Sequence, residues 1–271
     1  MSDRVYRWDS EDYARHSAAQ QEWALELIDK LALRGGEAVL DIGSGDGKVT
    51  AALAARLPRG QVLGIDSSPA MVARARRAFP PQRHSNLRFQ HGDALDLAFE
   101  KSFDAAFSNA TLHWVHDHLR VLKGVARALK PSGRLLFQMG GRGNASEILG
   151  VLAELARERP WDAWLADLPF PYGFYGPEEY RGWLAQAGLA ARRVVLIPKL
   201  MRQQGAEGLA GWVRTTWLPY TQAVPEGRRQ EFVDQVVRRY LALRPPGPDG
   251  TVTVRMVRLE VEASRASLDD R

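Results

Sequence analysis

The chain has 271 residues, 45% hydrophobic and 25% charged, which is typical of a soluble globular protein with one large α/β domain or a core and a smaller lobe. It contains no cysteine, which excludes disulfides, zinc–thiolate sites and thiol nucleophiles. The net charge of +5 comes from scattered arginines and lacks the basic stripe of a nucleic-acid binder. No signal peptide or membrane-spanning run is visible, so we expect a cytoplasmic protein with neither nucleic acid nor a membrane as partner.

Strands and helices alternate through the first half of the chain. Short apolar runs predict strands, and segments with helical periodicity predict the helices between them. The predicted strands cover residues 38–42, 61–66, 87–90, 103–107 and 134–139. The predicted helices cover residues 17–33, 49–57, 69–79 and 117–129. This order favours an α/β fold with a doubly wound, mostly parallel sheet and helices on both faces.

Helical patterns dominate beyond residue 144. They cover residues 145–157, 177–187, 206–218 and 226–243, with an aromatic, proline-rich loop at 161–176 and strands at 193–197 and 251–261. We therefore expect a cofactor-binding core with an N-terminal helix at 1–144 and mainly helical cap insertions at 145–190 and 199–250. Core strands within 191–198 and 251–264 would complete the sheet.

The most informative stretch is Asp41-Ile42-Gly43-Ser44-Gly45-Asp46-Gly47, where a strand ends in an acid and a helix follows three glycines. Glycine lets the backbone turn sharply and a ligand approach closely. In a dinucleotide site with the spacing Gly-x-Gly-x-x-Gly, the third glycine comes one residue later than Gly47 does here. The preceding Asp41 would repel a pyrophosphate but suits a cationic group such as an ammonium.

Two more acids lie at the ends of the next strands. Asp66 ends the second strand, where a carboxylate can accept both hydrogen bonds of a ribose diol, and Asp93 follows the third, near where an adenine amino group would donate. Three acids at successive strand ends suit an adenosyl ligand that carries a free amino acid. For the glycine loop alone, a site of the NAD type remains the alternative.

Four motifs occur in the order found in class I S-adenosylmethionine-dependent methyltransferases, which the chain resembles over about residues 20–140. They are Asp41–Gly47, Gly64-Ile65-Asp66-Ser67-Ser68, Gly92-Asp93-Ala94 and Leu129-Lys130-Pro131-Ser132-Gly133-Arg134-Leu135. The resemblance implies S-adenosylmethionine as cofactor. It also implies a seven-stranded sheet whose last strand, at 251–261, runs antiparallel beside the fifth.

The same resemblance implies a role for each cofactor-binding residue. Asp41 would lie near the ammonium, Gly43 and Gly45 against the methionine part, and Asn109 would reach the methionine moiety. Ser44, between the two glycines, is also expected to bind the cofactor. Asp66 would bind the ribose, Ser67 would border the adenine, and Asp93 and Ala94 would contact the adenine ring. Asp46 and Lys48 are expected to be a solvated helix start.

The segment Ser108-Asn109-Ala110-Thr111-Leu112-His113-Trp114-Val115 resembles the trans-aconitate and juvenile hormone acid methyltransferases, which methylate carboxylates. That resemblance, together with the spacing of Tyr13 and Gln20, implies that Gln20 and Trp114 donate hydrogen bonds to an acceptor carboxylate. A carboxylate is already ionised at neutral pH, so it needs no general base. His113 could act as a base for a neutral hydroxyl, but packing beside the cofactor is favoured.

Three further features have structural interpretations that we prefer. His116-Asp117-His118 is interpreted as a helix start capped by Asp117, so no metal site is expected. Arg142 and Arg214 could clamp a carboxylate bidentately, although each is typical of a surface arginine. Aromatic side chains between 161 and 220 would line the cap, and Trp217 stands where the trans-aconitate group is expected to have a small residue.

The motifs and the resemblance that they carry predict transfer of a methyl group to a small-molecule acceptor by in-line displacement. An oxygen is the expected acceptor atom and a carboxylate is one candidate for it, while nitrogen and carbon stay open. The alternatives left open are a catalytically silent regulatory protein that binds the cofactor, an RNA or protein methyltransferase, and an NAD-dependent oxidoreductase. The sequence predicts neither the acceptor nor the oligomeric state.

Overall fold

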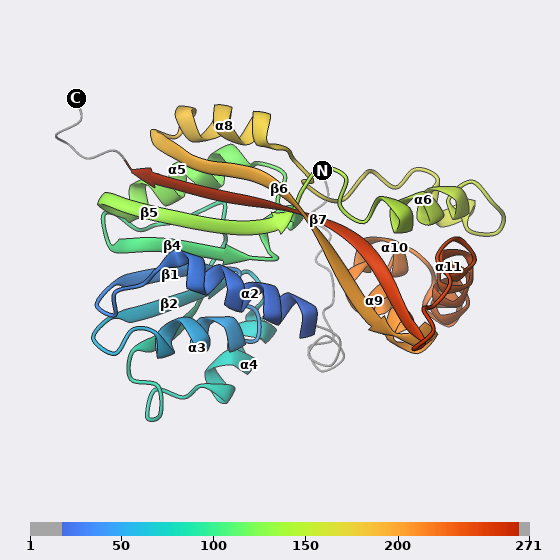
Figure 1. The fold of residues 1–271 in the computed structure, drawn as a ribbon, viewed down its shortest axis with the longest axis horizontal. Helices are drawn as coiled ribbons and strands as arrows, with labels where there is room; N and C mark the ends of the chain where they lie inside the picture. The colour runs from blue at the N-terminus through green and yellow to red at the C-terminus, as the bar shows by residue number, and fades with distance from the viewer. Residues whose placement is uncertain (1–17, 266–271) are drawn as a thin grey trace. The chain divides into compact units, whose positions relative to one another are not determined.

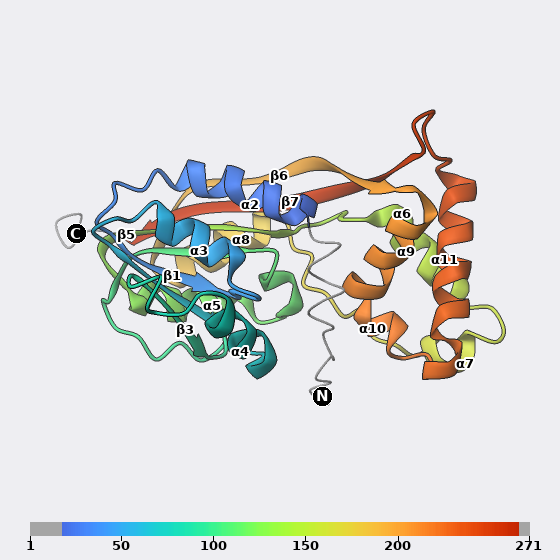
Figure 2. The ribbon, with the colours of Figure 1, turned by 90° about the horizontal axis from the view of Figure 1, so that it is seen from below.

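The computed structural model describes residues 18–265, with side chains from residue 22 onward (Figures 1 and 2). The strands are β1 (Ala38–Ile42), β2 (Gln61–Asp66), β3 (Leu87–His91), β4 (Phe103–Asn109), β5 (Leu129–Gly140), β6 (Leu189–Gln204) and β7 (Thr251–Arg265). The helices are α2 (Ala18–Leu31), α3 (Lys48–Ala55), α4 (Pro69–Ala78), α5 (His118–Ala128), α6 (Ser146–Leu155), α7 (Asp162–Leu165), α8 (Pro177–Gln186), α9 (Gly205–Thr216), α10 (Leu218–Thr221) and α11 (Arg229–Leu243). Two short 3-10 helices are η1 (Leu112–Trp114) and η2 (Glu226–Arg228).

The chain forms two compact units. The sheet unit contains residues 20–142, 172–197 and 258–265. The helical unit contains residues 18–19, 143–171 and 198–257. Both β6 and β7 continue from one unit into the other. The cap role expected of the inserted segments remains a prediction.

A seven-stranded sheet with the order β3-β2-β1-β4-β5-β7-β6 forms the centre of the sheet unit (Figure 1). β1 pairs in parallel with β2 and β4, β2 with β3, and β4 with β5. β7 pairs antiparallel with β5, from Arg134 opposite Ser264 to Gly140 opposite Arg258. The expected fold, including an antiparallel last strand beside the fifth, is confirmed.

Two apolar layers cover the faces of this sheet. On one face, α2, α3 and α4 pack through residues such as Leu27, Leu53 and Val72 against the strands. On the other face, α5 and α8 pack through residues such as Val125 and Leu184. Both layers consist of buried apolar side chains, so the sheet is rigid. The ligand-binding edge is the one where the parallel strands end.

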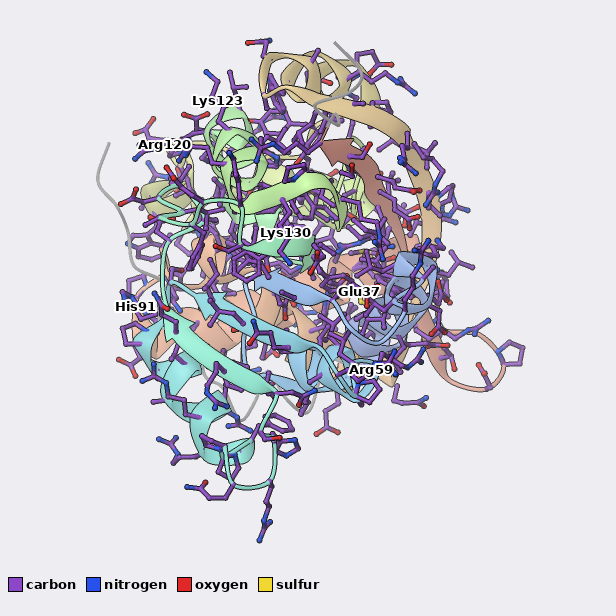
Figure 3. All side chains as sticks on the ribbon, turned by 90° about the vertical axis from the view of Figure 1, so that its left-hand side faces the viewer. Glu37, Arg59, His91, Arg120, Lys123 and Lys130 are labelled. Atoms are coloured by element: carbon purple, nitrogen blue, oxygen red, sulfur yellow. The ribbon has the colours of Figure 1, made fainter. Side chains whose placement is uncertain are left out.

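Figure 3 shows the opposite edge, where the parallel strands begin and where Glu37, Arg59 and Lys130 are labelled. The Glu37 carboxylate accepts hydrogen bonds from the backbone N–H groups of Arg34, Gly35 and Gly36 at 2.7–3.1 Å. These bonds hold the pKa of Glu37 below its ordinary value although burial opposes them. The acidic side chain at this edge therefore closes the turn into β1.

The structure departs from the sequence predictions mainly at the later strands. β6 extends to Gln204, although residues 199–204 were expected to contain no strand. Met201 and Gln203 are buried there while Arg202 and Gln204 are exposed, which is the alternation of a strand. The sequence hides this alternation because the exposed positions include the apolar Leu200, whereas Lys199 and Gln203 lie on the more buried face.

β5 starts at Leu129, earlier than expected, because the strand contains an irregularity. Phe103 pairs with Leu129, but Ala105 pairs with Arg134, so the residues between them bulge out of the ladder. Ser132 has a φ of +60° within this bulge. The turn predicted at 130–133 is therefore present, but the structure incorporates it into the strand.

Three further differences concern helices. The predicted 161–176 loop contains α7, and α10 follows α9 directly. α7 and α10 have only four residues each, which is too few to show a helical periodicity in the sequence. α8 packs in the sheet unit through Tyr180 and Leu184, whereas we expected residues 145–190 to form a cap.

None of the helices that the structure describes is long and apolar enough to cross a membrane.

Candidate active site

The glycine loop is fixed to β2 by its own backbone. The N–H groups of Gly43 and Ser44 both donate to the carbonyl of Ile65, at 2.8 and 2.9 Å. The φ angles of Gly43, Gly45 and Gly47 are +80°, +54° and +87°, in the region that favours glycine. The loop therefore needs glycine at all three alternate positions.

The three glycines differ in what surrounds them. A Cβ atom on Gly43 would lie 2.1 Å from the Thr111 side chain, and one on Gly47 would lie 2.7 Å from the Phe89 ring. A Cβ atom on Gly45 would have nothing within 4 Å. Gly43 and Gly47 are thus glycines because protein atoms fill the space, while the backbone at Gly45 borders open space that a ligand can enter.

Asp66 connects the end of β2 to the glycine loop. One carboxylate oxygen accepts from the N–H of Gly45 at 2.9 Å, and the other accepts from the N–H of Ser68 at 2.8 Å. Burial raises the pKa of Asp66, and these two hydrogen bonds oppose that rise. Each oxygen keeps a further lone pair, so the carboxylate can still accept from a diol.

Asp41 is almost completely buried at the end of β1. The hydroxyl of Thr50 on α3 donates to its Oδ2 at 2.7 Å. Burial raises the pKa of Asp41 to about 7, the Thr50 hydrogen bond opposes the rise, and the negative charge of Asp66 adds to it. A cationic ligand group beside Asp41 would reverse this shift by favouring the carboxylate form.

The other expected cofactor residues surround the same edge but differ in what they offer. Ser44 uses its N–H on Ile65, and its buried hydroxyl has no hydrogen-bond partner within residues 18–265. Asp93 is exposed and accepts from the N–H of Leu95 at 2.9 Å, with Ala94 half-buried beside it. Ser67 is exposed after β2, and Asn109 ends β4 half-buried.

These features fit S-adenosylmethionine, the cofactor that the sequence motifs imply. The open space at Gly45 lies beside Asp66, a carboxylate suited to the ribose, and near Asp41, a carboxylate that a cation would stabilise. A pyrophosphate would meet the same two acids at a cost in repulsion. The individual contacts assigned to these residues remain predictions.

The segment after β4 is shaped by Thr111 and η1. Ala110 has a φ of +55°, and its N–H donates to the Gln138 carbonyl at 2.8 Å, which turns the chain across the end of β5. The Thr111 hydroxyl donates to the carbonyl of Gly43 at 3.1 Å. η1 then places His113 and Trp114 on the same edge as the glycine loop.

His113 and Trp114 belong to an aromatic cluster with Tyr172 and Phe174. The N–H of Gly173 donates to the His113 carbonyl at 2.9 Å and so holds the two segments together. The Trp114 and Tyr172 rings meet edge to face at 5.1 Å, and Tyr172 stacks on Phe174 at the same distance. Trp114 is half-buried, so part of its indole faces outward from the cluster.

His113 is buried and neutral. Burial lowers its pKa well below the ordinary value, and the positive charge of Arg258 adds to the effect. Its Nδ1 accepts a long hydrogen bond of 3.5 Å from the N–H of Gly140. An imidazole with so low a pKa is a weak base at neutral pH, which agrees with packing rather than proton abstraction.

Several expectations can be compared directly with the structure. Asp117 caps α5 by accepting from the N–H of Arg120 at 2.9 Å, as predicted, and Ser68 caps α4. His118 is buried, bonded to Tyr180 and to the carbonyl of Val115, with its pKa lowered by burial to about 4. Asp46 and Lys48 form an ion pair with each other at 3.1 Å.

The expected arginine clamp and cap walls look different in the structure. Arg142 is exposed and pairs with Glu178 and Glu179 of α8, and Arg214 is exposed on α9. Trp161, Trp212 and Trp217 are at most 3% exposed and form the core of the helical unit. Gln20 lies in α2, but its side chain is outside the described part of the chain, as is all of Tyr13.

Sequence reasoning missed three residues that shape this site: Thr50, Thr111 and Arg258. Thr50 lies nine residues after Asp41, in the first turn of the helix that follows the glycine loop. Its place in that turn was a signal in the sequence that could have predicted the contact with Asp41. Thr111 meets the site only through its tertiary contact with Gly43, which no local pattern indicates. Arg258 lies in the predicted last strand, and nothing in the sequence indicated that this arginine is buried.

Comparison with known proteins supports the same assignment. A family model described as a methyltransferase domain matches residues 40–137. The chain is 31% identical to trans-aconitate 2-methyltransferase of Methylobacterium nodulans, over 95% of this chain and 98% of that protein. It is 29% identical to the enzyme of that name from Shigella flexneri, over 95% and 98% of the two chains. A solved protein of Bacillus halodurans shares the fold, with a TM-score of 0.62 at 17% identity over 90% of this chain and 99% of that one.

Proposed function

Because the chain belongs to the class I S-adenosylmethionine-dependent methyltransferases, in the group of the trans-aconitate 2-methyltransferases, we propose that it methylates a carboxylate oxygen of a small organic acid. Its activity is that of a methyltransferase, and its cofactor is S-adenosylmethionine. The silent regulatory protein, the RNA or protein methyltransferase and the NAD-dependent oxidoreductase are not favoured. The names of the relatives support an acid as acceptor.

The observation that carries the proposal is the state of His113. The residue best placed in the sequence to serve as a base is buried, neutral and of low pKa. A phenol or alcohol must lose a proton during methyl transfer, and this imidazole is poorly suited to take it. A carboxylate arrives ionised and needs no base, so a weakly basic His113 is compatible with it.

The bound cofactor supplies an electrophilic methyl group on a sulfonium. Asp66 would hold the ribose hydroxyls, with Ser67, Asp93 and Ala94 around the adenine. Asp41 would face the ammonium, with Gly43, Ser44, Gly45 and Asn109 along the methionine part. These residues fix one reactant relative to the rigid sheet.

Trp114 and Gln20 would hold the other reactant by donating hydrogen bonds to the acceptor carboxylate. When an anion attacks a cation, charge is neutralised, so stabilising the transition state by polar groups gains little. Alignment of the two reactants is the larger contribution, worth on the order of 7–11 kcal/mol for well-oriented pairs. The aromatic cluster behind Trp114 makes this alignment rigid.

The test is product formation with the purified enzyme. It is incubated with S-adenosylmethionine and with trans-aconitate, other organic acids, phenols and alcohols, and the products are identified by mass spectrometry. We expect a base-labile methyl ester from at least one acid and no ether. Methylation confined to phenols or alcohols would contradict the proposal.

Trp114→Phe adds a residue-level test because it keeps a ring and removes the indole N–H. Loss of one hydrogen bond to a charged acceptor predicts a KM for the acid raised roughly 10- to 100-fold, with unchanged affinity for S-adenosylhomocysteine. Trp183→Phe, on α8 in the same unit, is the control and should leave KM unchanged. An unchanged KM in Trp114→Phe would remove this residue from the acceptor site.

A further inference from the structure

Arg258 is a buried arginine at the point where β7 meets the carboxyl end of β5. It is 3% exposed and lies opposite Gly140 in the β5–β7 ladder. The N–H of that same Gly140 donates to Nδ1 of His113. Gly140 therefore links Arg258, its partner in the ladder, to His113 in the segment that carries Trp114.

The Arg258 side chain extends over the face of the sheet that α2 covers. Its guanidinium carbon lies 5.6 Å from the centre of the Trp23 ring, a cation–π contact with α2. Glu260, two residues along the same strand, also faces α2 and binds Lys30 at 3.0 Å.

The charge of Arg258 acts on the active-site segment. It contributes to the lowered pKa of His113, so its positive potential reaches that ring. In a water-poor environment such a potential attracts an anion more strongly than at the surface. Arg258 thus combines a fixed cation, little exposure to water and a position between α2 and the segment that follows β4.

We propose that Arg258 binds a carboxylate of the acceptor other than the one that is methylated, so that the enzyme selects acids with two or more carboxylates. This rests on the proposed function, since it assumes that the acceptor is an acid. The guanidinium fork matches a carboxylate bidentately, and its planar face is already held against Trp23. Arg258 is thereby a specificity-determining residue, while Trp114 and Gln20 are assigned to the reacting group.

The experiment compares acceptors that differ in their number of carboxylates in the native enzyme, Arg258→Met and Arg258→Lys. The probes are trans-aconitate with three carboxylates, fumarate with two and crotonate with one. Arg258→Met keeps much of the volume and removes the charge, a change that buried arginines tolerate in some proteins. Arg255→Met is the matched control, because Arg255 is an exposed arginine on the same strand.

We expect Arg258→Met to weaken binding of trans-aconitate to the complex with S-adenosylhomocysteine, measured by calorimetry, by roughly 10- to 100-fold. The KM for trans-aconitate and fumarate should rise by the same factor, and kcat/KM for crotonate should change less than about twofold. Arg258→Lys should recover part of the loss, because it restores the charge without the fork. Arg255→Met should match the native enzyme.

Two results would overturn the inference. An equal loss for all three acids, accompanied by weaker binding of S-adenosylhomocysteine, would make Arg258 a support for α2 instead of an acceptor ligand. Unchanged affinity for trans-aconitate in Arg258→Met would exclude the contact. Failure of the proposed function appears separately, because the native enzyme would then form no methyl ester from any acid.

Discussion

The side chain of Thr111 occupies the space that a side chain on Gly43 would need. A Cβ atom at position 43 would lie 2.1 Å from both Oγ1 and Cγ2 of Thr111. The Thr111 hydroxyl also donates to the carbonyl of Gly43. The first glycine of the loop and the first turn after β4 are thus fitted to each other, although they are far apart in the chain.

Gly43→Ala should therefore destabilise the fold. The new methyl group overlaps Thr111, and the φ of +80° is unfavourable for alanine. We expect a loss of about 2–5 kcal/mol in the free energy of unfolding, from overpacking and from the left-handed backbone together. Chemical denaturation followed by circular dichroism measures it, and a loss below about 1 kcal/mol would contradict the fitted contact.

Gly45→Ala is the matched variant and should behave differently. Nothing lies within 4 Å of the new methyl group, so only the backbone strain of about 1–2 kcal/mol applies. The methyl group projects into the space assigned to the cofactor, and the affinity for S-adenosylhomocysteine should fall at least roughly tenfold. Calorimetry on the folded variant tests this, and native affinity would show that the cofactor does not approach Gly45.

Asp66→Asn should weaken cofactor binding without unfolding the protein. The amide keeps one oxygen for a backbone N–H but places an NH₂ group against the other donor. We expect roughly 10- to 100-fold weaker binding of S-adenosylhomocysteine by calorimetry. Asp96→Asn, at an exposed position with no assigned contact, serves as the control. Equal affinities in the two variants would remove Asp66 from the ribose site.

Asp41 should make the cofactor-free protein less stable as the pH rises. Its folded pKa of about 7 lies above its unfolded value, so folding takes up a proton between the two. The stabilisation is full below the unfolded pKa and is lost as the pH passes through 7. By linkage, the free energy of unfolding should fall by on the order of 2–3 kcal/mol between pH 5 and 8 from this group.

Asp41→Asn tests that dependence, since an amide can still accept from Thr50 and does not titrate. Denaturation midpoints at pH 5, 6, 7 and 8 should show a smaller slope in the variant, which should exceed the native protein in stability at pH 8. The slope that remains includes Asp66, whose pKa is raised in the same direction. Parallel slopes in the two proteins would show that Asp41 is not the group responsible.

His113→Asn should retain much of the native kcat with an acid as acceptor. The asparagine oxygen can replace Nδ1 as acceptor for the N–H of Gly140, and the reaction needs no base. The pH profile of kcat should show no limb near the ordinary histidine pKa in either protein. A limb present in the native profile and absent in the variant would instead assign His113 a role as base.

Local patterns in the sequence were sufficient for most of the sheet unit. Apolar runs at β1, β2 and β4 mark buried parallel strands, and Ser68 and Asp117 mark the starts of α4 and α5 as caps. The family resemblance supplied the antiparallel β7. These elements are recognisable because periodicity, capping and glycine spacing are properties of neighbouring residues.

What the sequence did not reveal depends on distant residues meeting. The extent of β6 is hidden because the apolar Leu200 is exposed while Lys199 and Gln203 lie on the more buried face. The packing of Tyr172 on Trp114 joins two loops, and the burial of Arg258 depends on where α2 lies over β7. Such contacts have no period and no local spacing, so only the fold brings them together.

The strand order of the sheet has a consequence for synthesis and truncation. In the sheet described here, β6 is hydrogen-bonded to the rest only through β7, although it precedes β7 in the chain. While the ribosome is still making residues 205–250, the completed β6 has no strand to join, and β5 presents an open edge. A chain stopped before residue 251 would therefore lose two strands of its sheet, not one, and would expose a template for aggregation.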